Sequence, residues 1–180
     1  LAIGPILRLL SHRPVVIAMT ATAPPEIRAE IEQLLNMDQV SRFQVPLHRK
    51  NLTFVIQPTE SRKQREKALK KLLAKHQGES IIVYCSTKAM TDRVYEVVNK
   101  WYPGQVAKSH SEAEERRRSE EAFLSGQRNI IVATSAFGMG VDKPDVRLVV
   151  LYGLPLSPLD FYQQAGRGGR DGKKSTCVLL

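Results

Sequence analysis

Two arginines three residues apart, Arg167 and Arg170, are the side chains in this sequence best suited to chemistry. Glycines separate them in the string Gly166-Arg-Gly-Gly-Arg170, and glycine lets the backbone come close to a ligand. A guanidinium group is planar and permanently charged, so it suits two-point contacts with phosphate oxygens. An arginine supplied by a neighbouring domain can raise the rate of phosphoryl transfer by roughly 10³–10⁵. The pair therefore indicates a phosphate or nucleotide site.

Three other polar residues have types and positions that fit such a site. Gln163 lies one helical turn before the first arginine, where its amide can contact a nucleotide or orient a water molecule. Asp142 follows Gly138-Met-Gly140, and its carboxylate can hold a ribose hydroxyl. Thr134 ends an apolar run, and from there its hydroxyl can contact a backbone phosphate of nucleic acid.

Two pairs of hydroxyl residues stand at predicted helix starts. Ser86 and Thr87 follow an apolar run, and hydroxyl and N–H groups at a helix start can bind an anion. The same residue types also serve as ordinary N-caps, so both interpretations stay open. Thr20 and Thr22 precede a helix that begins at Pro24-Pro25, where a capping role and a functional role are equally open.

The elements that must position these residues alternate between strand and helix. Apolar, strand-like runs occupy residues 15–19, 52–57, 80–85, 105–108, 129–134, 146–151 and 176–180. Strands separated by helical crossovers predict an α/β fold, with a parallel sheet and helices on both faces. Ligands of such sheets bind where strand ends release their loops. We therefore expect the polar loops of residues 129–170 to meet at one edge of the sheet.

The regular pattern of apolar and polar residues is lost at residues 41–51. This stretch holds Pro46 and His48-Arg-Lys-Asn51 with no clean period, which is typical of a connector between domains. Residues 1–40 accordingly look like the tail of one α/β unit, and residues 52–180 form a second unit. The chain begins at Leu1, so we expect an excerpt of a longer protein.

Composition is ordinary for a globular protein, with 42% hydrophobic and 25% charged residues among 180. The net charge of +9 favours polyanionic partners. No apolar run approaches the roughly 18 residues that span a bilayer, so no membrane partner is predicted. Cys85 and Cys177 have no metal-binding spacing, and no metal site is predicted. They are expected to be buried in a reducing compartment, the cytoplasm (bacterial nucleoid) or the nucleus.

One group of motifs is missing. The sequence contains no Gly-x-x-x-x-Gly-Lys-Ser/Thr string and no metal-holding carboxylate pair after a strand. Without them this chain cannot hold Mg²⁺-ATP and hydrolyse it alone. We therefore expect its arginines to act on a phosphate held by another domain.

Four strings together resemble motifs III, IV, V and VI of a RecQ-type superfamily 2 DNA helicase, in the same order and over nearly the whole chain. They are Met19-Thr-Ala-Thr-Ala-Pro24, Ile82-Val-Tyr-Cys-Ser-Thr-Lys88, Ala133-Thr-Ser-Ala-Phe-Gly-Met-Gly-Val-Asp-Lys-Pro-Asp-Val-Arg147 and Phe161-Tyr-Gln-Gln-Ala-Gly-Arg-Gly-Gly-Arg-Asp-Gly172. The most specific piece is Ala136-Phe-Gly-Met-Gly-Val-Asp-Lys-Pro144. DEAD-box RNA helicases usually carry Ala-Arg-Gly-x-Asp there, and they fit less well. Gly168 replaces the alanine usual in motif VI, a change between small residues that we expect to be tolerated.

The resemblance implies a RecA-like (P-loop NTPase-type) architecture. Residues 1–40 would finish the first RecA-like domain, 41–51 would connect, and 52–180 would form the second domain. ATP with Mg²⁺ would be bound mainly by the missing first domain. The implied roles are an arginine finger (Arg170) with an assistant (Arg167), nucleotide contacts (Gln163, Gly140, Asp142), contacts to phosphates of the tracking strand (Ser86, Thr87, Thr134) and coupling of the ATP site to strand movement (Thr20, Thr22).

The function that follows is the second motor half of an ATP-dependent DNA helicase of repair or recombination. The resemblance implies 3′–5′ movement on single strands or strand junctions of DNA, and the excerpt alone is expected to be inactive. Two alternatives are a non-catalytic nucleic-acid-binding domain that kept the fold, and a related motor such as a DEAD-box-like RNA helicase. The intact arginine pair argues against the first, since a pure binder gains little from it.

Overall fold

The computed structural model describes residues 3–20, 23–44, 49–109, 113–138 and 141–180. The chain divides into two compact units, residues 1–47 and 48–180. This boundary falls within the stretch that the sequence marks as a connector. None of the helices in the described residues is long and apolar enough to cross a membrane.

Unit 1 contains helices α1 (Ile3–Leu9) and α2 (Pro25–Leu34). The N-cap of α2 is Pro24, which makes no side-chain capping bond. Of the two threonines considered for a capping role, Thr22 lies outside the described residues. The strand predicted at residues 15–19 is wrong: the segment is not in a strand, and Val15 and Met19 are 91% and 90% exposed. A strand needs a neighbour to pair its N–H and C=O groups, and the described part of unit 1 contains no other strand.

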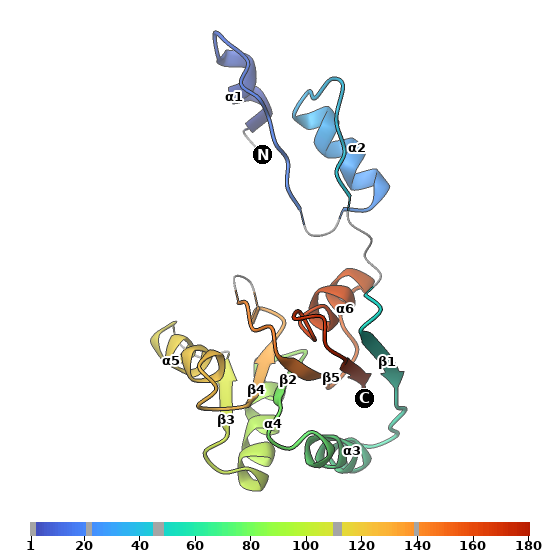
Figure 1. Ribbon diagram of the computed structural model, residues 1–180, viewed down its shortest axis with the longest axis vertical. Coiled ribbons are helices and arrows are strands. Elements are labelled where there is room, and N and C mark those ends of the chain that lie inside the picture. Colours follow the sequence, from blue (N-terminus) through green and yellow to red (C-terminus); the bar gives the residue numbers. More distant parts are fainter. Residues whose placement is uncertain (1–2, 21–22, 45–48, 110–112, 139–140) are drawn as a thin grey trace. The chain divides into compact units, whose positions relative to one another are not determined.

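Unit 2 is built on a parallel sheet of six strands in the order β1-β6-β5-β2-β4-β3 (Figure 1). The strands are β1 (Leu52–Ile56), β2 (Ser80–Cys85), β3 (Val106–Ser109), β4 (Ile130–Thr134), β5 (Val146–Leu151) and β6 (Ser175–Leu179). The fold class predicted from the sequence is confirmed. We call the side of the sheet where the strands begin the amino edge, and the side where they end the carboxyl edge.

Helices cover both faces of this sheet, because the strand side chains alternate between two apolar layers. One layer joins Ile81 and Val83 of β2 to helices α3 (Arg62–Lys75) and α4 (Lys88–Trp101). The other joins Ile82 and Tyr84 of β2 to helices α5 (Ala113–Leu124) and α6 (Pro158–Ala165). Figure 1 shows α3 and α4 on one side of the sheet and α6 on the other.

In the described residues of the connection from β4 to β5 there is no helix. Both strands pair with β2, so residues 135–145, which we call the crossover loop, pass across β2 from the carboxyl edge to the amino edge. Phe137 is buried in the α5–α6 layer, and Val141 packs against that layer. The loop thus lies on the face of the sheet where a crossover helix would otherwise lie.

Candidate active site

The two arginines predicted to do chemistry converge on one backbone oxygen. Nη1 of Arg167 lies 3.3 Å and Nη1 of Arg170 lies 3.1 Å from the carbonyl oxygen of Val141 in the crossover loop. Arg170 also donates to the Asp142 carboxylate at 2.8 Å. The structure therefore brings the arginine pair together with Asp142, which lies 28 residues before Arg170 in the sequence.

Local signals in the sequence explain how α6 delivers the arginines. The Ser157 hydroxyl caps the helix by accepting a bond from the Asp160 N–H at 3.0 Å, and Pro158 stands in the first turn. The helix ends at Ala165 and is followed by residues 166–173, which we call the arginine loop. The Gly169 N–H donates to the Val146 carbonyl at 2.8 Å, at the start of β5. The arginine loop is therefore fixed at the amino edge.

This position corrects one expectation. The sequence suggested that the loops of residues 129–170 meet at one edge of the sheet, because ligands of such sheets bind at strand ends. The loops after β4 and β5 do begin at the carboxyl edge, but α6 is a crossover helix and returns the chain to the amino edge before β6. The crossover loop makes the same passage, which is why Val141 reaches the arginines.

Gly138 is required by the close approach of the crossover loop to Arg167. Its φ is +112°, which L side chains rarely adopt, and an added Cβ would lie 2.8 Å from Nε of Arg167. The Tyr84 hydroxyl donates to the neighbouring Phe137 carbonyl at 3.2 Å. Burial raises the pKa of the Tyr84 phenol, so it stays protonated and remains a donor.

The electrostatics of the pair suit an anion. Partial burial lowers the pKa of the Arg167 guanidinium, and the nearby charge of Arg170 acts in the same direction. The charge of the Asp142 carboxylate acts in the opposite direction but does not reverse the shift. A partly buried cation of this kind is stabilised by an anionic partner. The Arg170 side chain is 32% exposed and its partner Asp142 is 80% exposed, so that ion pair is accessible to a competing phosphate. The residues present thus fit phosphate groups of a nucleotide.

The other predicted nucleotide contacts are less well defined. Gln163 is exposed on α6, and the structure shows no hydrogen bond from it to either arginine. Its role remains a prediction. Gly140 lies outside the described residues, as does Thr22 of unit 1. Thr20 is described and exposed, and it lies just before α2 in unit 1.

Ser86, Thr87 and Thr134 lie at the carboxyl edge. Cys85 pairs in register with Thr134, so the loops after β2 and β4 start side by side. Thr87 is the N-cap of α4 and accepts a bond from the Met90 N–H at 3.1 Å, which confirms the capping interpretation. The cap uses the oxygen as an acceptor, so the hydroxyl proton can still be donated to an anion.

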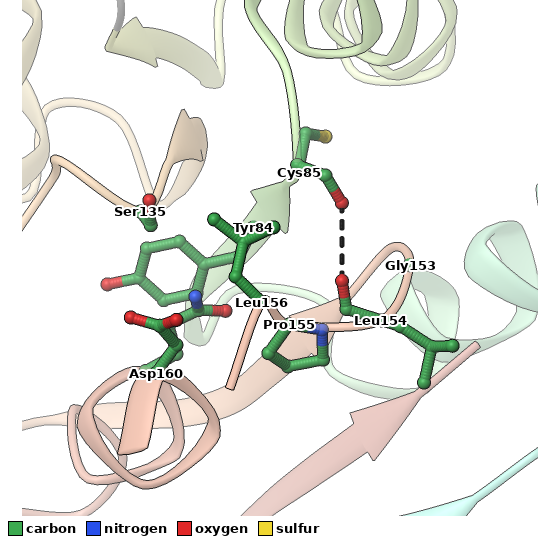
Figure 2. Close-up of a pocket in the computed structure, with 10 residues that line it drawn as sticks. Tyr84, Cys85, Ser135, Gly153, Leu154, Pro155, Leu156 and Asp160 are labelled. Atoms are coloured by element: carbon green, nitrogen blue, oxygen red, sulfur yellow. Dashed lines mark hydrogen bonds between the residues drawn. The ribbon is translucent and has the colours of Figure 1, made fainter. Parts of the chain in front are cut away.

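A pocket opens beside Ser86, and Figure 2 shows it. Its lining includes Tyr84, Ser86, Ser135, Leu154, Asp160 and Gln164. The Ser86 hydroxyl lies 3.5 Å from the Leu154 carbonyl, a long and weak contact, and Ser86 is exposed. The Ser86 hydroxyl is therefore available to a ligand.

Reasoning from the sequence missed three residues around this site. Arg49 and Asn51, which were assigned to the connector, donate to carbonyl groups of the arginine loop. Lys143 is only 8% exposed, and its ammonium group lies 3.1 Å from Asp145 and over the ring of Phe123. No spacing rule identifies Arg49 and Asn51, because their partners are backbone groups. The burial of Lys143 against Phe123 is not visible in the sequence either, because these two residues lie far apart along the chain.

The two cysteines behave as small buried residues. Burial raises the pKa of Cys85 and of Cys177 to about 12, so neither thiol is a nucleophile near neutral pH. Both are free. Within the described residues, no group of His, Cys, Asp and Glu side chains could hold a metal ion.

Comparison with known proteins finds similarity to helicases. Residues 64–172 match the family model of the helicase conserved C-terminal domain. The ATP-dependent DNA helicase RecQ of Bacillus subtilis (strain 168) is 35% identical, over 97% of this chain and 29% of the relative. A putative ATP-dependent RNA helicase of Acanthamoeba polyphaga mimivirus is 34% identical, over 92% of this chain and 30% of the relative. The chain therefore spans less than a third of either relative.

Among solved structures, S. cerevisiae Dbp5 bound to RNA and ADP BeF3 matches with a TM-score of 0.79. The match covers 98% of this chain and 47% of that chain, and the sequence identity is 18%. At this identity the likeness shows the fold alone.

Proposed function

Because this chain belongs to the family of the helicase conserved C-terminal domain, with RecQ-type DNA helicases among its relatives, we propose that it is the second motor half of an ATP-dependent DNA helicase. The observation that carries the proposal is the convergence of Arg167 and Arg170 on the Val141 carbonyl, with Asp142 as the partner of Arg170. Two guanidinium groups placed together, one of them paired with an exposed carboxylate, form a site for phosphate oxygens.

In this proposal Arg170 is the arginine finger. It exchanges its exposed ion pair with Asp142 for the transferred phosphate, and Arg167 holds a neighbouring oxygen. ATP supplies the phosphoryl group, and its Mg²⁺ and phosphate-binding loop belong to the first motor domain of the full-length protein. Asp142, Gly140 and Gln163 contact the nucleotide. Thr20 and Thr22 couple nucleotide state to movement of the DNA strand.

The carboxyl edge of the sheet then serves the DNA. Ser86, Thr87 and Thr134 hold phosphates of the tracking strand through hydroxyl and N–H groups, which read no base sequence. The family resemblance implies 3′–5′ movement. RNA is the second candidate substrate, favoured by the similarity to the putative mimivirus RNA helicase.

The test replaces Arg170 with alanine in the full-length protein. We expect nucleic-acid-stimulated ATP hydrolysis to fall by roughly 10³-fold or more, because the finger stabilises charge in the transition state. Binding to single-stranded DNA should stay nearly intact. Arg118→Ala is the matched control, since Arg118 is also an exposed arginine paired with a carboxylate, Glu114, at 2.7 Å.

Turnover at the wild-type level in Arg170→Ala would remove the finger assignment. Comparing stimulation by single-stranded DNA with stimulation by RNA of the same length and sequence decides between the two substrates. A protein that binds DNA but hydrolyses no ATP in any form would be a non-catalytic binding domain instead.

A further inference from the structure

The arginine loop is held by two side chains from the segment that precedes β1. Arg49 donates from Nη1 to the Gly166 carbonyl at 3.1 Å and from Nη2 to the Gly169 carbonyl. Asn51 donates from Nδ2 to the Gly169 carbonyl at 2.7 Å and to the Lys173 carbonyl at 2.8 Å. The three accepting carbonyl groups lie before, between and after the two arginines. The pair of donors therefore spans the whole loop.

The donors are themselves fixed by backbone bonds. The Asn51 carbonyl accepts a bond from the Ser175 N–H at 2.9 Å, at the start of β6, and the Leu52 N–H donates to the Arg49 carbonyl at 3.1 Å. Within the described residues Arg49 forms no ion pair, so its guanidinium group is committed to loop carbonyl groups. The forked shape of a guanidinium group suits two acceptors at once.

The close approach of the arginine loop to Asn51 and Ser175 explains why the loop has glycine at positions 168 and 169. A Cβ at Gly169 would lie 2.6 Å from Nδ2 of Asn51 and 2.5 Å from the Lys173 carbonyl, and φ is +51°. A Cβ at Gly168 would lie 2.5 Å from the Ser175 hydroxyl. The alanine usual at position 168 is therefore tolerated here only if that hydroxyl rotates away. The loop is pressed against the segment that carries Asn51.

Other contacts keep the loop on the sheet without these donors. Arg147 pairs with Asp171, and the Asp171 N–H donates to the Pro144 carbonyl at 3.2 Å. Losing Arg49 should therefore change the conformation of the loop without unfolding the unit. A residue with a purely structural role would instead destabilise the whole unit when it is lost, so the two roles can be distinguished.

We infer that Arg49 and Asn51 are positioning residues that set the place of Arg167 and Arg170 for phosphoryl transfer. This inference rests on the proposed function. The boundary between the two compact units lies just before Arg49, at residues 47 and 48. The segment through which unit 2 is joined to unit 1 is thus also the segment that holds the arginine loop.

The test uses Arg49→Ala in the full-length protein. Since misplacing a catalytic group by about 1 Å can cost 10²-fold, we expect kcat for ATP hydrolysis to fall roughly 10–100-fold. KM for ATP and DNA affinity should change by no more than about threefold, because the charges of both catalytic arginines remain. Hydrogen exchange of amides in residues 166–173 should become faster, while exchange in β5 stays unchanged.

Arg128→Ala is the matched control. Arg128 is also a partly buried arginine that donates to a backbone carbonyl, that of Val106 at 3.0 Å, and it does not contact the arginine loop. This variant should keep wild-type kcat and wild-type exchange in residues 166–173. Arg49→Lys should lie between wild type and Arg49→Ala, because an ammonium group lacks the fork that holds two carbonyl groups.

If Arg49→Ala fails to fold, Asn51→Asp tests the positioning role instead. This variant keeps the size of the side chain and removes the amide that donates to the Gly169 and Lys173 carbonyl groups. Wild-type kcat and unchanged loop exchange in a folded variant, at either position, would overturn the inference. The exchange measurement does not depend on catalysis. Suppose that Arg170→Ala keeps full turnover while Arg49→Ala speeds amide exchange in residues 166–173. The proposed role of Arg170 then fails, and the conclusion that Arg49 holds the arginine loop in place is kept.

Discussion

Replacing Gly138 with alanine moves Arg167 without altering its charge. The added Cβ would lie 2.8 Å from Nε and 3.0 Å from Cζ of Arg167, and 3.2 Å from the Tyr84 hydroxyl. Carbon contacts are comfortable at roughly 3.5–4 Å, so the guanidinium group has to move by roughly 0.5–1 Å. The Tyr84 ring is buried and cannot give way easily, so the displacement falls mainly on the arginine.

Two effects of different size follow from this change. The left-handed backbone at position 138 costs an L residue roughly 1–3 kcal/mol, which lowers the free energy of unfolding. The displaced guanidinium group lowers kcat for ATP hydrolysis by roughly 10–100-fold, since catalysis depends on placing the group to within about 1 Å. The loss of activity should therefore greatly exceed what the fraction of unfolded protein explains.

Gly126→Ala separates the two effects. Gly126 has a φ of +79°, but a Cβ there would meet nothing within 4 Å, so only the backbone cost of about 1 kcal/mol remains. Both variants are measured in the full-length protein by urea unfolding and by DNA-stimulated ATP hydrolysis. If Gly138→Ala hydrolyses ATP within about twofold of Gly126→Ala, the position of Arg167 is unimportant and the proposed role fails.

Two other residues give predictions about stability. Tyr84→Phe leaves the Phe137 carbonyl without its buried donor, and it should lower the free energy of unfolding in urea by about 1–2 kcal/mol. For Asp145, burial opposes ionisation, but the Lys143 ammonium and Ser80 hydroxyl groups outweigh it and lower the pKa. Its stabilising contribution is therefore present above about pH 4 and is lost as pH falls through the lowered folded-state pKa. Wild type should lose stability more steeply than Asp145→Asn below about pH 4 in acid titrations of unfolding, and parallel curves would contradict this.

The sequence predicted the central strands well because their signal is local. β2 and β5 are largely apolar runs with polar residues on either side, and the structure places their bounds at the residues expected, Ser80–Cys85 and Val146–Leu151. The start of α4 could be predicted for the same reason, since threonine, the residue type at position 87, often caps helices. Patterns of this kind depend on residue type alone.

Features that depend on partners far along the chain could not be predicted from the sequence. Residues 15–19 have the composition of a strand, but without a paired neighbour they stay exposed. Arg49 and Asn51 looked like irregular connector because their partners are backbone carbonyl groups, which every residue carries. The convergence of Arg167 and Arg170 on Val141 required the crossover loop to pass over β2, and strand order sets that path.

The crossover loop connects the two kinds of chemistry proposed for this domain. It leaves β4 directly after Thr134, the proposed phosphate contact, and its Val141 carbonyl accepts bonds from both arginines. The Tyr84 hydroxyl fixes the loop near its start, and the Lys143–Asp145 pair fixes it near its end. A helix in this connection would satisfy its own carbonyl groups, because its backbone bonds are internal. In the described residues of this connection the backbone is irregular, which leaves the Val141 carbonyl free to hold the arginines. The same segment can therefore reach both the strand end and the arginine pair.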